Sequence, residues 1–396
     1  MTSTSPRIAI IGAGLGGLSL LTHLQRYSIS ATLYEKDESF DARSHIGGIL
    51  DMHYESGQRA LNEAKIEWRH LTRPESEEMR IYDSQGTLLL EDDGKHGPPG
   101  TPGAGDEQSR PEIDRTPLRK LFYDYVAPSN SIKWSHNFTS ARCLPDSTYE
   151  LTFADGATAT CDLLVGADGA WSRVRPLVSP AKPAFSGITG VETSLAPARL
   201  AAPELQDVAA HVGQGTCFSS KGGDALVSQR AGDGRIRTYV WFRAPEASVL
   251  PTDDVPATRA VLLARFAGWA PWQRRLISEC DPAAVYPRPL YSLPVGHKWE
   301  SQRGVTLIGD AAHLMLPSGK GANLALLDGL ELALALAGAR ESGQGWQEAV
   351  QAFESEMCTR AGECAAEAVE ISSLFFGDGA PQAAVDFFKS HMPPPE

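Results

Sequence analysis

A glycine cluster near the start of the chain has the spacing of a nucleotide-binding turn. Gly12, Gly14 and Gly17 fit the pattern G-x-G-x-x-G, between an apolar strand pattern and an apolar helix pattern. Glycine permits the tight turn, and the N–H groups at the start of the following helix favour a pyrophosphate. Farther along, Glu35 can accept hydrogen bonds from ribose hydroxyls and would repel a 2′-phosphate, which favours FAD or NAD over NADP as the tightly bound nucleotide. The alternative is a glycine-rich turn without a ligand.

Two more strand patterns end in glycine and polar residues. The apolar residues 163–165 precede Asp168, which begins a D-G-x-x-S-x-x-R pattern that closes at Arg175. The apolar residues 304–308 precede Gly309 and Asp310, where a helix pattern starts. An aspartate in that place can bind a ligand or cap the helix, and both interpretations could hold. The chain therefore has three strand ends with groups that could bind a ligand.

The segments between and after these strand ends have different sequence patterns. Residues 185–291 contain short β-like runs such as 225–229 and 237–242, which are typical of a separate sheet-built module. Residues 346–376 are rich in alanine and glutamate and predict a helix. Residues 92–112 are rich in glycine and proline and predict a long mobile loop.

Composition narrows the classes of function. The 396 residues allow two or three domains at roughly 100–200 residues each. A net charge of −13 argues against nucleic acid as a partner. The six cysteines are scattered and predict neither a zinc site nor a disulfide framework. The start of the chain does not resemble a signal peptide, and the longest apolar run, 324–339, is interrupted by charges, so we expect a cytoplasmic protein with no integral membrane association.

As a set, these motifs resemble those of the single-component (class A) FAD-dependent monooxygenases of the para-hydroxybenzoate hydroxylase fold. The similarity is greatest to the tetracycline-inactivating branch, because G-G-I-L-D-M-H at 47–53 and P-E-I-D-R-T-P-L-R at 111–119 also match. The resemblance spans roughly residues 7–340. It implies an α/β protein with a discontinuous, Rossmann-like FAD-binding domain of the GR2 type, a β-sheet substrate domain and a C-terminal helix.

The resemblance also implies domain boundaries. The FAD-binding domain is expected at 1–75, 110–182 and 285–345, the substrate-binding domain at 76–109 and 183–284 with its mobile loop at 92–112, and the C-terminal helical segment at 346–390. We expect a monomer, with a dimer as the alternative.

The family pattern assigns a set of residues to the cofactors FAD and NADPH. They are Gly12, Gly14, Gly17, Glu35, Lys36, Arg43, Asp51, Arg115, Asp168, Asp310, Pro317, Gly319, Gly321, Ala322 and Asn323. Asp310 corresponds to the aspartate that binds the ribityl chain. The helix that starts at 319–323 would stabilise negative charge on the reduced flavin. For His313 a packing or hydrogen-bonding role is favoured over proton transfer.

The sequence has only one G-x-G-x-x-G, so a second Rossmann domain for NADPH is not expected. In the family NADPH binds transiently over the flavin. Lys36 and Arg43 could then contact its phosphates, and a solvent-exposed arginine is the alternative for Arg43. Lys320 stands where the family commonly has a neutral residue. It could favour anionic reduced flavin, or it could simply face solvent.

The predicted reaction inserts one oxygen atom from O2 into a bulky cyclic or aromatic molecule that is polyketide-, alkaloid- or tetracycline-like. The resemblance implies a flavin C4a-hydroperoxide and no catalytic nucleophile of the protein, no metal, and a place in secondary metabolism. Glu192 aligns with a substrate-binding glutamine of the family, and Phe218 and Trp241 offer aromatic surface. One alternative is a flavin- or ligand-binding protein without turnover, because the loop at Pro317–Gly319 is one residue shorter than in the branch. The other is a flavin halogenase, whose W-x-W-x-I-P signature is absent.

Overall fold

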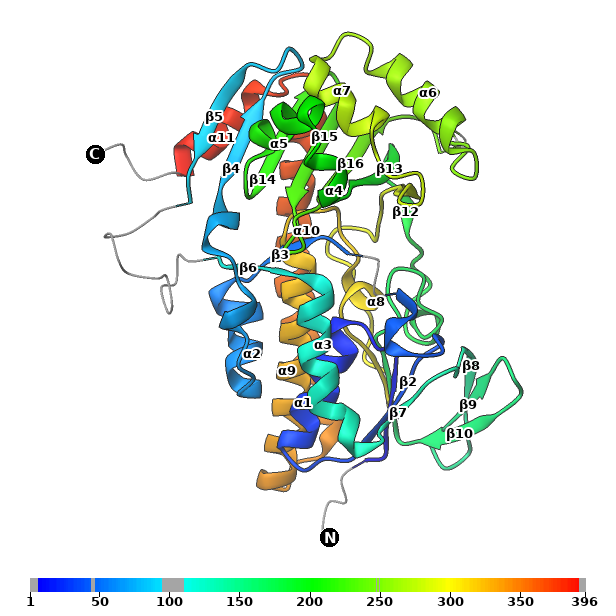
Figure 1. Cartoon of the computed structure of the whole chain (residues 1–396). Helices are drawn as coiled ribbons and strands as arrows, with labels where there is room; N and C mark the ends of the chain where they lie inside the picture. Colours follow the sequence, from blue (N-terminus) through cyan, green and yellow to red (C-terminus); the bar gives the residue numbers. More distant parts are fainter. Residues whose placement is uncertain (1–5, 44–46, 95–109, 247, 249, 392–396) are drawn as a thin grey trace. The chain divides into compact units, whose positions relative to one another are not determined.

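The protein forms two compact units. The structure is a computed structural model, and it describes residues 6–43, 47–94, 110–246, 248 and 250–391 (Figure 1). Unit 1 comprises Met1–Leu71, Arg115–Ala184 and Tyr291–Ala368, and unit 2 comprises Thr72–Asp114, Phe185–Leu290 and Val369–Glu396. Most of the predicted mobile loop at 92–112 lies outside the described residues. The assignment of FAD to one unit and of the substrate to the other remains a prediction.

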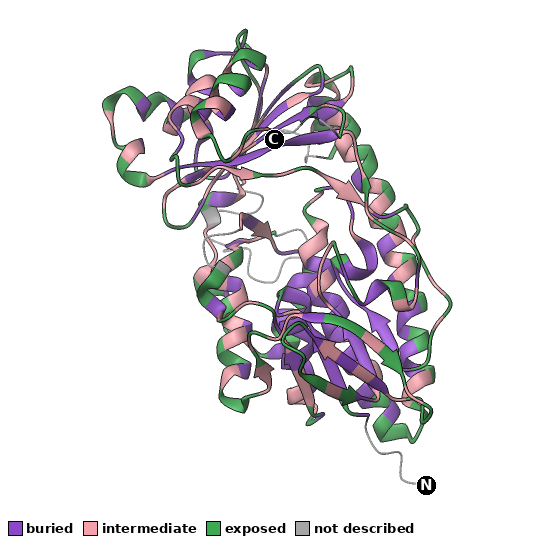
Figure 2. Cartoon of the chain, turned by 90° about the vertical axis from the view of Figure 1, so that its right-hand side faces the viewer, coloured by how far each residue is buried: buried purple, intermediate pink, exposed green. Residues whose placement is uncertain are grey.

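Unit 1 is built on a parallel sheet of five strands in the order β19-β11-β1-β2-β7. The strands are β1 (Ile8–Ile11), β2 (Ala31–Tyr34), β7 (Ile132–Lys133), β11 (Leu163–Gly166) and β19 (Val305–Leu307). β1, β11 and β19 are buried along their whole length, shown in purple in Figure 2, as expected for a parallel sheet covered on both faces. Because these three strands are parallel neighbours, the segments that follow them emerge at one edge of the sheet.

Unit 1 also contains helices. They are α1 (Leu15–Arg26), α2 (Arg59–Ala64), α3 (Arg115–Val126), α8 (Asp310–His313), α9 (Lys320–Ser342) and the first part of α10 (Trp346–Phe376). The remaining strands of the unit are β3 (Ile49–Asp51), the antiparallel trio β8 (Phe138–Cys143), β9 (Tyr149–Phe153) and β10 (Thr158–Cys161), and β18 (Tyr291–Ser292). β12 (Ala184–Phe185) lies at the boundary between the units, and a π-helix at Tyr54–Gln58 precedes α2.

α1 and α9 pack closely against each other. The Ser19 hydroxyl donates a hydrogen bond to the Leu326 carbonyl at 2.8 Å. A Cβ on Gly329 would come within 2.6 Å of the Leu20 nitrogen, so only glycine allows this approach. Among the described helices, α9 alone is long and apolar enough to cross a bilayer, but 67% of its most apolar window is buried within the protein. Packing in the core therefore accounts for its composition.

Unit 2 contains a seven-stranded sheet in the order β17-β13-β16-β15-β14-β4-β5, antiparallel except where β4 pairs with β14. Its strands are β4 (Met79–Tyr82), β5 (Leu88–Asp92), β13 (Ile188–Leu195), β14 (Thr216–Lys221), β15 (Asp224–Arg230), β16 (Ile236–Arg243) and β17 (Tyr286–Pro287), and β6 (Glu112–Asp114) lies outside this sheet. The helices are α4 (Pro197–Leu200), α5 (Gln206–Val212), α6 (Val255–Arg265), α7 (Pro271–Ser278) and α11 (Gln382–His391).

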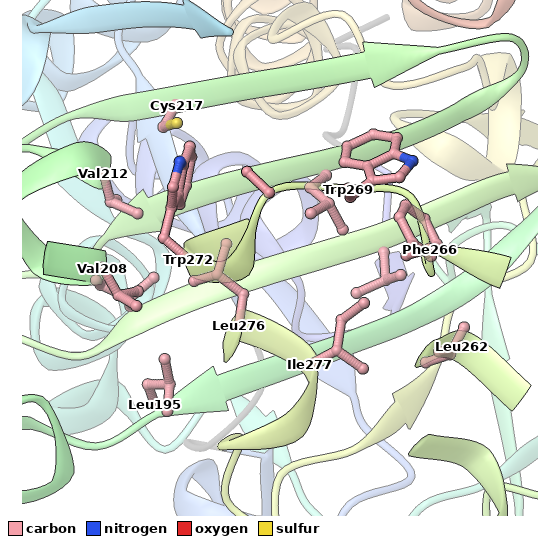
Figure 3. Packing of buried hydrophobic residues seen from close by; sticks show 14 of the residues in the cluster. Leu195, Val208, Val212, Cys217, Leu262, Phe266, Trp269, Trp272, Leu276 and Ile277 are labelled. Atoms are coloured by element: carbon pink, nitrogen blue, oxygen red, sulfur yellow. The ribbon is translucent and has the colours of Figure 1, made fainter. Parts of the chain in front are cut away.

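The two faces of this sheet belong to two hydrophobic clusters. On one face, Val191 and Val240 belong to a cluster with Phe266, which follows α6, and Trp272 of α7; Figure 3 labels both aromatic residues. The other face contributes Trp241 and several other residues to a second cluster, with aromatic residues from the end of α10. The alternation follows from the period of two in a strand.

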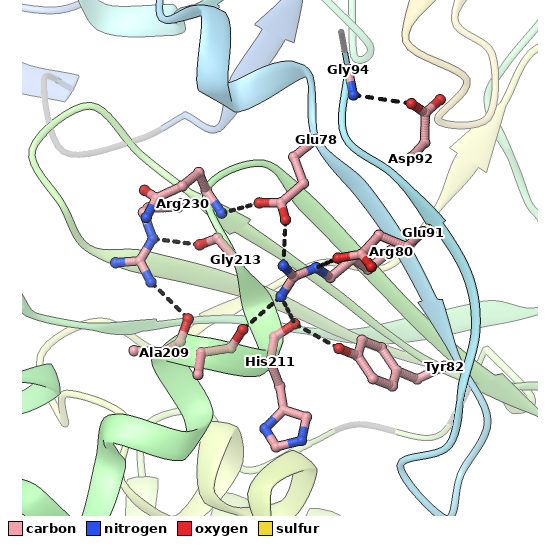
Figure 4. A network of polar contacts seen from close by, with 12 residues as sticks. Glu78, Arg80, Tyr82, Glu91, Asp92, Gly94, Ala209, His211, Gly213 and Arg230 are labelled. Carbon is pink, nitrogen blue, oxygen red and sulfur yellow. Dashed lines mark hydrogen bonds and ion pairs between the residues drawn. The ribbon is translucent and has the colours of Figure 1, made fainter. Parts of the chain in front are cut away.

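Arginine side chains bind the carboxyl end of α5 (Figure 4). Arg80 on β4 donates to the carbonyls of Ala210 at 2.6 Å and His211 at 3.3 Å. Arg230 donates to the carbonyls of Gly213 at 2.6 Å and Ala209 at 3.0 Å. These contacts satisfy carbonyl groups that a helix end leaves without intrahelical partners.

Candidate active site

The turn after β1 provides an open helix start. Gly12 has φ +107°, and a Cβ there would come within 2.4 Å of the Ala167 carbonyl oxygen. A Cβ on Gly17 would come within 2.0 Å of the Gly12 carbonyl oxygen. At Gly14, the N-cap of α1, a Cβ would meet nothing within 4 Å. Two glycines are thus required by packing, and the third borders open space at the helix start, which fits a pyrophosphate.

Glu35 is held at the same turn. It is buried, and its Oε2 accepts a hydrogen bond from the Ala13 N–H at 2.7 Å, while Oε1 accepts one from Asp37 at 3.0 Å. Each carboxylate oxygen can accept a further bond, so ribose hydroxyls remain possible donors. Lys36 is exposed next to it. Arg43 ends the short 3-10 turn at 40–43, and its side chain lies outside the described part of the chain.

Arg119 also binds this turn, although we did not assign it a role from sequence. Its Nε donates to the Ala13 carbonyl at 2.9 Å and its Nη1 to the Phe40 carbonyl at 3.0 Å. Its guanidinium also lies over the Phe40 ring, 4.5 Å from the centroid. The signal was present, because Arg119 closes the motif at 111–119.

Asp168 follows β11 and has one oxygen available. Its Oδ2 accepts a hydrogen bond from the Arg173 N–H at 2.7 Å. Its Oδ1 is buried and has no hydrogen-bond partner among the described residues. Burial raises the pKa of Asp168, and a hydrogen bond from Ser172 opposes that rise. A buried acceptor without a partner is costly, so a bound group with a hydroxyl or N–H would stabilise this site.

Arg175 connects two of the strand ends. It is 2% exposed, and its Nε donates to the Ala311 carbonyl at 2.7 Å. Its Nη2 donates to the carbonyls of Ala170 at 2.7 Å and Asp310 at 3.2 Å. Burial lowers the pKa of Arg175. The last residue of the D-G-x-x-S-x-x-R pattern therefore joins the loop after β11 to the segment after β19, a role that sequence reasoning missed.

α8 is fixed by a buried ion pair. The structure corrects the helix-cap interpretation of Asp310, because Gly309 is the N-cap and the exposed Asp310 is the first helical residue. His313 Nε2 lies 2.6 Å from Oδ2 of Asp328, which also accepts the Gly309 N–H at 2.9 Å. Burial is the largest single influence and lowers the pKa of His313, but the charge of Asp328, the hydrogen bond to Asp328 and the charge of Asp310 together outweigh it, so the pKa is raised. This geometry supports a hydrogen-bonding role for His313.

The start of α9 and the segment around β3 form a second cluster. Asn323 donates to the carbonyls of Asp51 at 2.7 Å and Gly319 at 3.1 Å, and it accepts the His53 N–H at 3.0 Å. His53 Nε2 lies 2.8 Å from the Asp51 carboxylate. A Cβ on Gly319, which has φ +82°, would come within 3.0 Å of that carboxylate, whereas one on Gly321 would meet nothing within 4 Å. The cluster leaves the helix start accessible to a negatively charged group.

The other predicted cofactor residues lie around this cluster or in the same segments. The exposed Arg115 packs its side chain against Gly47, where a Cβ would come within 2.8 Å of the arginine Cδ. Pro317 is exposed and Ala322 is half-buried. Lys320 donates a hydrogen bond to Glu367 of α10. Its charge is therefore paired with a carboxylate. Whether these residues contact FAD remains a prediction.

The predicted substrate residues lie on one face of the sheet in unit 2. Glu192 is 2% exposed, and its oxygens are bound by Arg237 at 2.8 Å and by Arg288 at 2.7 Å and 2.9 Å. Both oxygens of this candidate are therefore engaged within the unit. An ion pair of this kind was not foreseen, because the two arginines come from separate strands or loops.

Aromatic rings lie on the same face. Tyr239 stacks on Trp241 with centroids 4.8 Å apart. Phe218 stacks on Phe375 with centroids 4.9 Å apart, and Phe388 lies 6.4 Å from Phe218. A groove of about 550 Å³ in unit 1, by contrast, lies between α9 and α10 and is lined by none of the predicted site residues.

Comparison with known proteins agrees with this geometry. The family model described as "FAD binding domain" matches residues 146–368. The chain belongs to the FAD-binding domain family. Among curated relatives, the monooxygenase asqM of Emericella nidulans is 31% identical over 383 residues, which cover 83% of each chain. The monooxygenase penA of Penicillium thymicola is 27% identical over 405 residues, covering 88% of this chain and 90% of the relative.

Solved structures show the same fold. The Klebsiella pneumoniae protein HpxO, complexed with FAD and uric acid, aligns with a TM-score of 0.76 and 23% identity over 97% of this chain and 92% of that one. The tetracycline destructase Tet(51) aligns with a TM-score of 0.70 and 19% identity over 98% of this chain and 95% of that one. The predicted α/β fold, the FAD cofactor and the class of FAD-dependent monooxygenase are thereby confirmed. A small molecule and O2 are accordingly the reactants.

Proposed function

We propose that this enzyme uses NADPH to insert one oxygen atom from O2 into a bulky cyclic or aromatic metabolite. The observation that carries the proposal is the shared edge of β2, β1 and β11. Glu35, an open helix start and an Asp168 oxygen without a partner among the described residues follow these three neighbouring strands. Such an edge is where open α/β sheets bind their nucleotides.

The residues fit FAD in four parts. The start of α1 at Gly14 would hold the pyrophosphate, and Glu35 would bind the ribose. Asp310, exposed at the edge, would bind the ribityl chain. The start of α9 with Asn323 and Gly321 would face the ring, where N–H groups stabilise negative charge. FAD, when bound, supplies the electron transfer and the activation of dioxygen.

NADPH requires a second, weaker site. The sequence has one G-x-G-x-x-G, which supports transient binding of NADPH rather than a dedicated domain. Lys36, which is exposed beside Glu35, is one candidate for contact with the phosphates of NADPH, and its position is described in the structure. Arg43 is the second candidate.

The sheet face in unit 2 supports an aromatic substrate. The half-buried rings of Tyr239 and Phe218 offer flat apolar surface, which binds planar molecules well, and the buried Trp241 supports Tyr239 by stacking on it. Glu192 binds Arg237 and Arg288, and it would orient the substrate by holding these two arginines in place. We also propose that the enzyme is cytoplasmic and monomeric. Sedimentation velocity at several protein concentrations would test whether it is a monomer.

The decisive experiment incubates the purified yellow protein with NADPH and a panel of planar polyketides and alkaloids. We expect substrate-dependent NADPH consumption and a product heavier by one oxygen atom. A protein that binds flavin without turnover would show no bleaching of the flavin by NADPH in a stopped-flow spectrometer. A halogenase would instead yield halogenated product when chloride or bromide is supplied.

A further inference from the structure

The first residue of α9 is a lysine, at a position where a positive charge is unfavourable. α9 begins at Lys320 after its N-cap Gly319, and its first turn contains no acidic residue. The free N–H groups at a helix start carry partial positive charge, so an anion stabilises this position and a cation destabilises it. Sequences break a local rule of this kind mostly at functional sites.

Lys320 is paired with a carboxylate from another helix. Its Nζ donates a hydrogen bond to Oε2 of Glu367 on α10, and the two side chains are 24% and 42% exposed. Lys320 is the first residue of α9, whereas Glu367 lies in the last third of α10; both helices are labelled in Figure 1. The pair therefore joins two long helices at the point where α9 begins.

Other charged groups nearby are already engaged. The Asp51 carboxylate lies on the Gly319 side of the helix start and is bound by His53. Arg360, on α10, pairs with Asp328 at 3.2 Å and with Glu331 at 2.7 Å. Glu367 is the carboxylate with which Lys320 forms an ion pair.

We propose that Glu367 keeps the reduction potential of the bound FAD low by neutralising Lys320. This rests on the proposed function, in which the flavin ring faces the start of α9. Reduction by NADPH transfers two electrons and one proton to the flavin as a hydride, and it leaves one negative charge on the ring at neutral pH. A paired lysine attracts that charge weakly, because the neighbouring carboxylate repels it. An unpaired lysine stabilises the reduced form.

The test measures the midpoint potential of the flavin in the purified holoenzyme by dye-coupled reduction. Glu367→Gln, which keeps the shape of the side chain and frees the lysine charge, should raise the equilibrium constant for reduction about tenfold, or about 30 mV for a two-electron couple. Lys320→Met should shift the potential in the opposite direction, because it leaves the carboxylate alone. The double variant should lie near the wild type.

A matched control is available on the same helix. Glu356 is exposed on α10, about three turns before Glu367, and Glu356→Gln removes the same charge. It should leave the potential unchanged, and Glu367→Asp should restore most of the wild-type value. If Glu367→Gln and Glu356→Gln have the wild-type potential, the inference is wrong although the enzyme still binds FAD. Protein purified without flavin would instead contradict the proposed function.

Discussion

The imidazole of His313 lies 2.6 Å from the carboxylate of Asp328, and both side chains are buried. Asp328 also accepts the Gly309 N–H and pairs with Arg360, so a single carboxylate fixes the loop after β19, α8 and α10. We predict that Asp328→Ala lowers the free energy of unfolding by about 3–5 kcal/mol, because it leaves buried partners unpaired. Urea denaturation of the holoenzyme would measure this.

The control for this prediction is Asp124→Asn, which breaks an exposed pair between neighbouring turns of α3. It should cost no more than about 0.5 kcal/mol. Equal losses in the two variants would mean that the buried pair contributes nothing special.

A second prediction concerns stability in acid. His23 on α1 is fully buried, and burial together with the nearby Arg26 lowers its pKa to about 4. Since the folded pKa lies below the unfolded value of 6.5, the unfolded chain binds a proton first as the pH falls. The free energy of unfolding is therefore highest above pH 6.5, and it falls by about 3 kcal/mol between pH 6.5 and pH 4. His23→Leu should remove that part of the pH dependence. If the free energy of unfolding, measured at pH 7 and pH 5, decreases as much in the variant as in the wild type, the prediction is wrong.

A third prediction separates two glycines of the same turn. Gly17→Ala should destabilise the protein with or without FAD, because the new methyl group meets the Gly12 carbonyl oxygen. Gly14→Ala should leave the melting temperature of the FAD-free protein within about 1 °C of the wild type, because its methyl group meets no protein atom. It should nevertheless weaken FAD binding at least tenfold, as measured by flavin fluorescence. Unchanged FAD affinity in Gly14→Ala would place the pyrophosphate elsewhere.

A fourth prediction tests the link between strand ends. Arg175→Lys keeps the charge but cannot reproduce three hydrogen bonds to the backbone from one planar fork. We expect a loss of about 2 kcal/mol or more in stability and weaker FAD binding, because Asp310 is no longer held. Arg173→Lys, at an exposed neighbour, is the comparison and should change both quantities much less. The two variants would behave alike if the link had no role.

A fifth prediction concerns the substrate side. Glu192→Gln removes the charge that two arginines share, so a purely structural role predicts a lower melting temperature and an unchanged KM. A role in substrate orientation predicts a KM raised severalfold at a temperature where the variant remains folded. Steady-state kinetics with a substrate found in the panel of polyketides and alkaloids would distinguish these results, and the raised KM is the one we expect.

Sequence patterns predicted the strand ends well because their physical basis is local. The turn at Gly12, the strand before Asp168 and the helix after Gly309 each follow from apolar runs punctuated by glycine, and all three appear in the parallel sheet. The cytoplasmic location and the individual FAD contacts remain predictions, since neither follows from the fold alone.

The supporting contacts could not be predicted in the same way. Asp328 and His313 are 15 residues apart, whereas Arg175 reaches Ala311 across 136 residues. Contacts of this kind depend on tertiary packing, which periodicity does not encode. The pairing of Lys320 with Glu367 is a further example. The sequence showed a lysine at the start of a helix but did not indicate its partner.

The three-part composition of unit 1 affects how the chain folds during synthesis. β1 and α1 are made early, but β19, which pairs with β11 in the same sheet, and α9, which packs on α1, follow some 300 residues later. At about 5–20 residues per second, α1 waits tens of seconds on the ribosome without α9. During that time the face of α1 that receives Leu326 and Gly329 is open to solvent. The nascent chain should therefore depend on chaperones until its last third emerges, and long-range pairing of this kind makes folding slow.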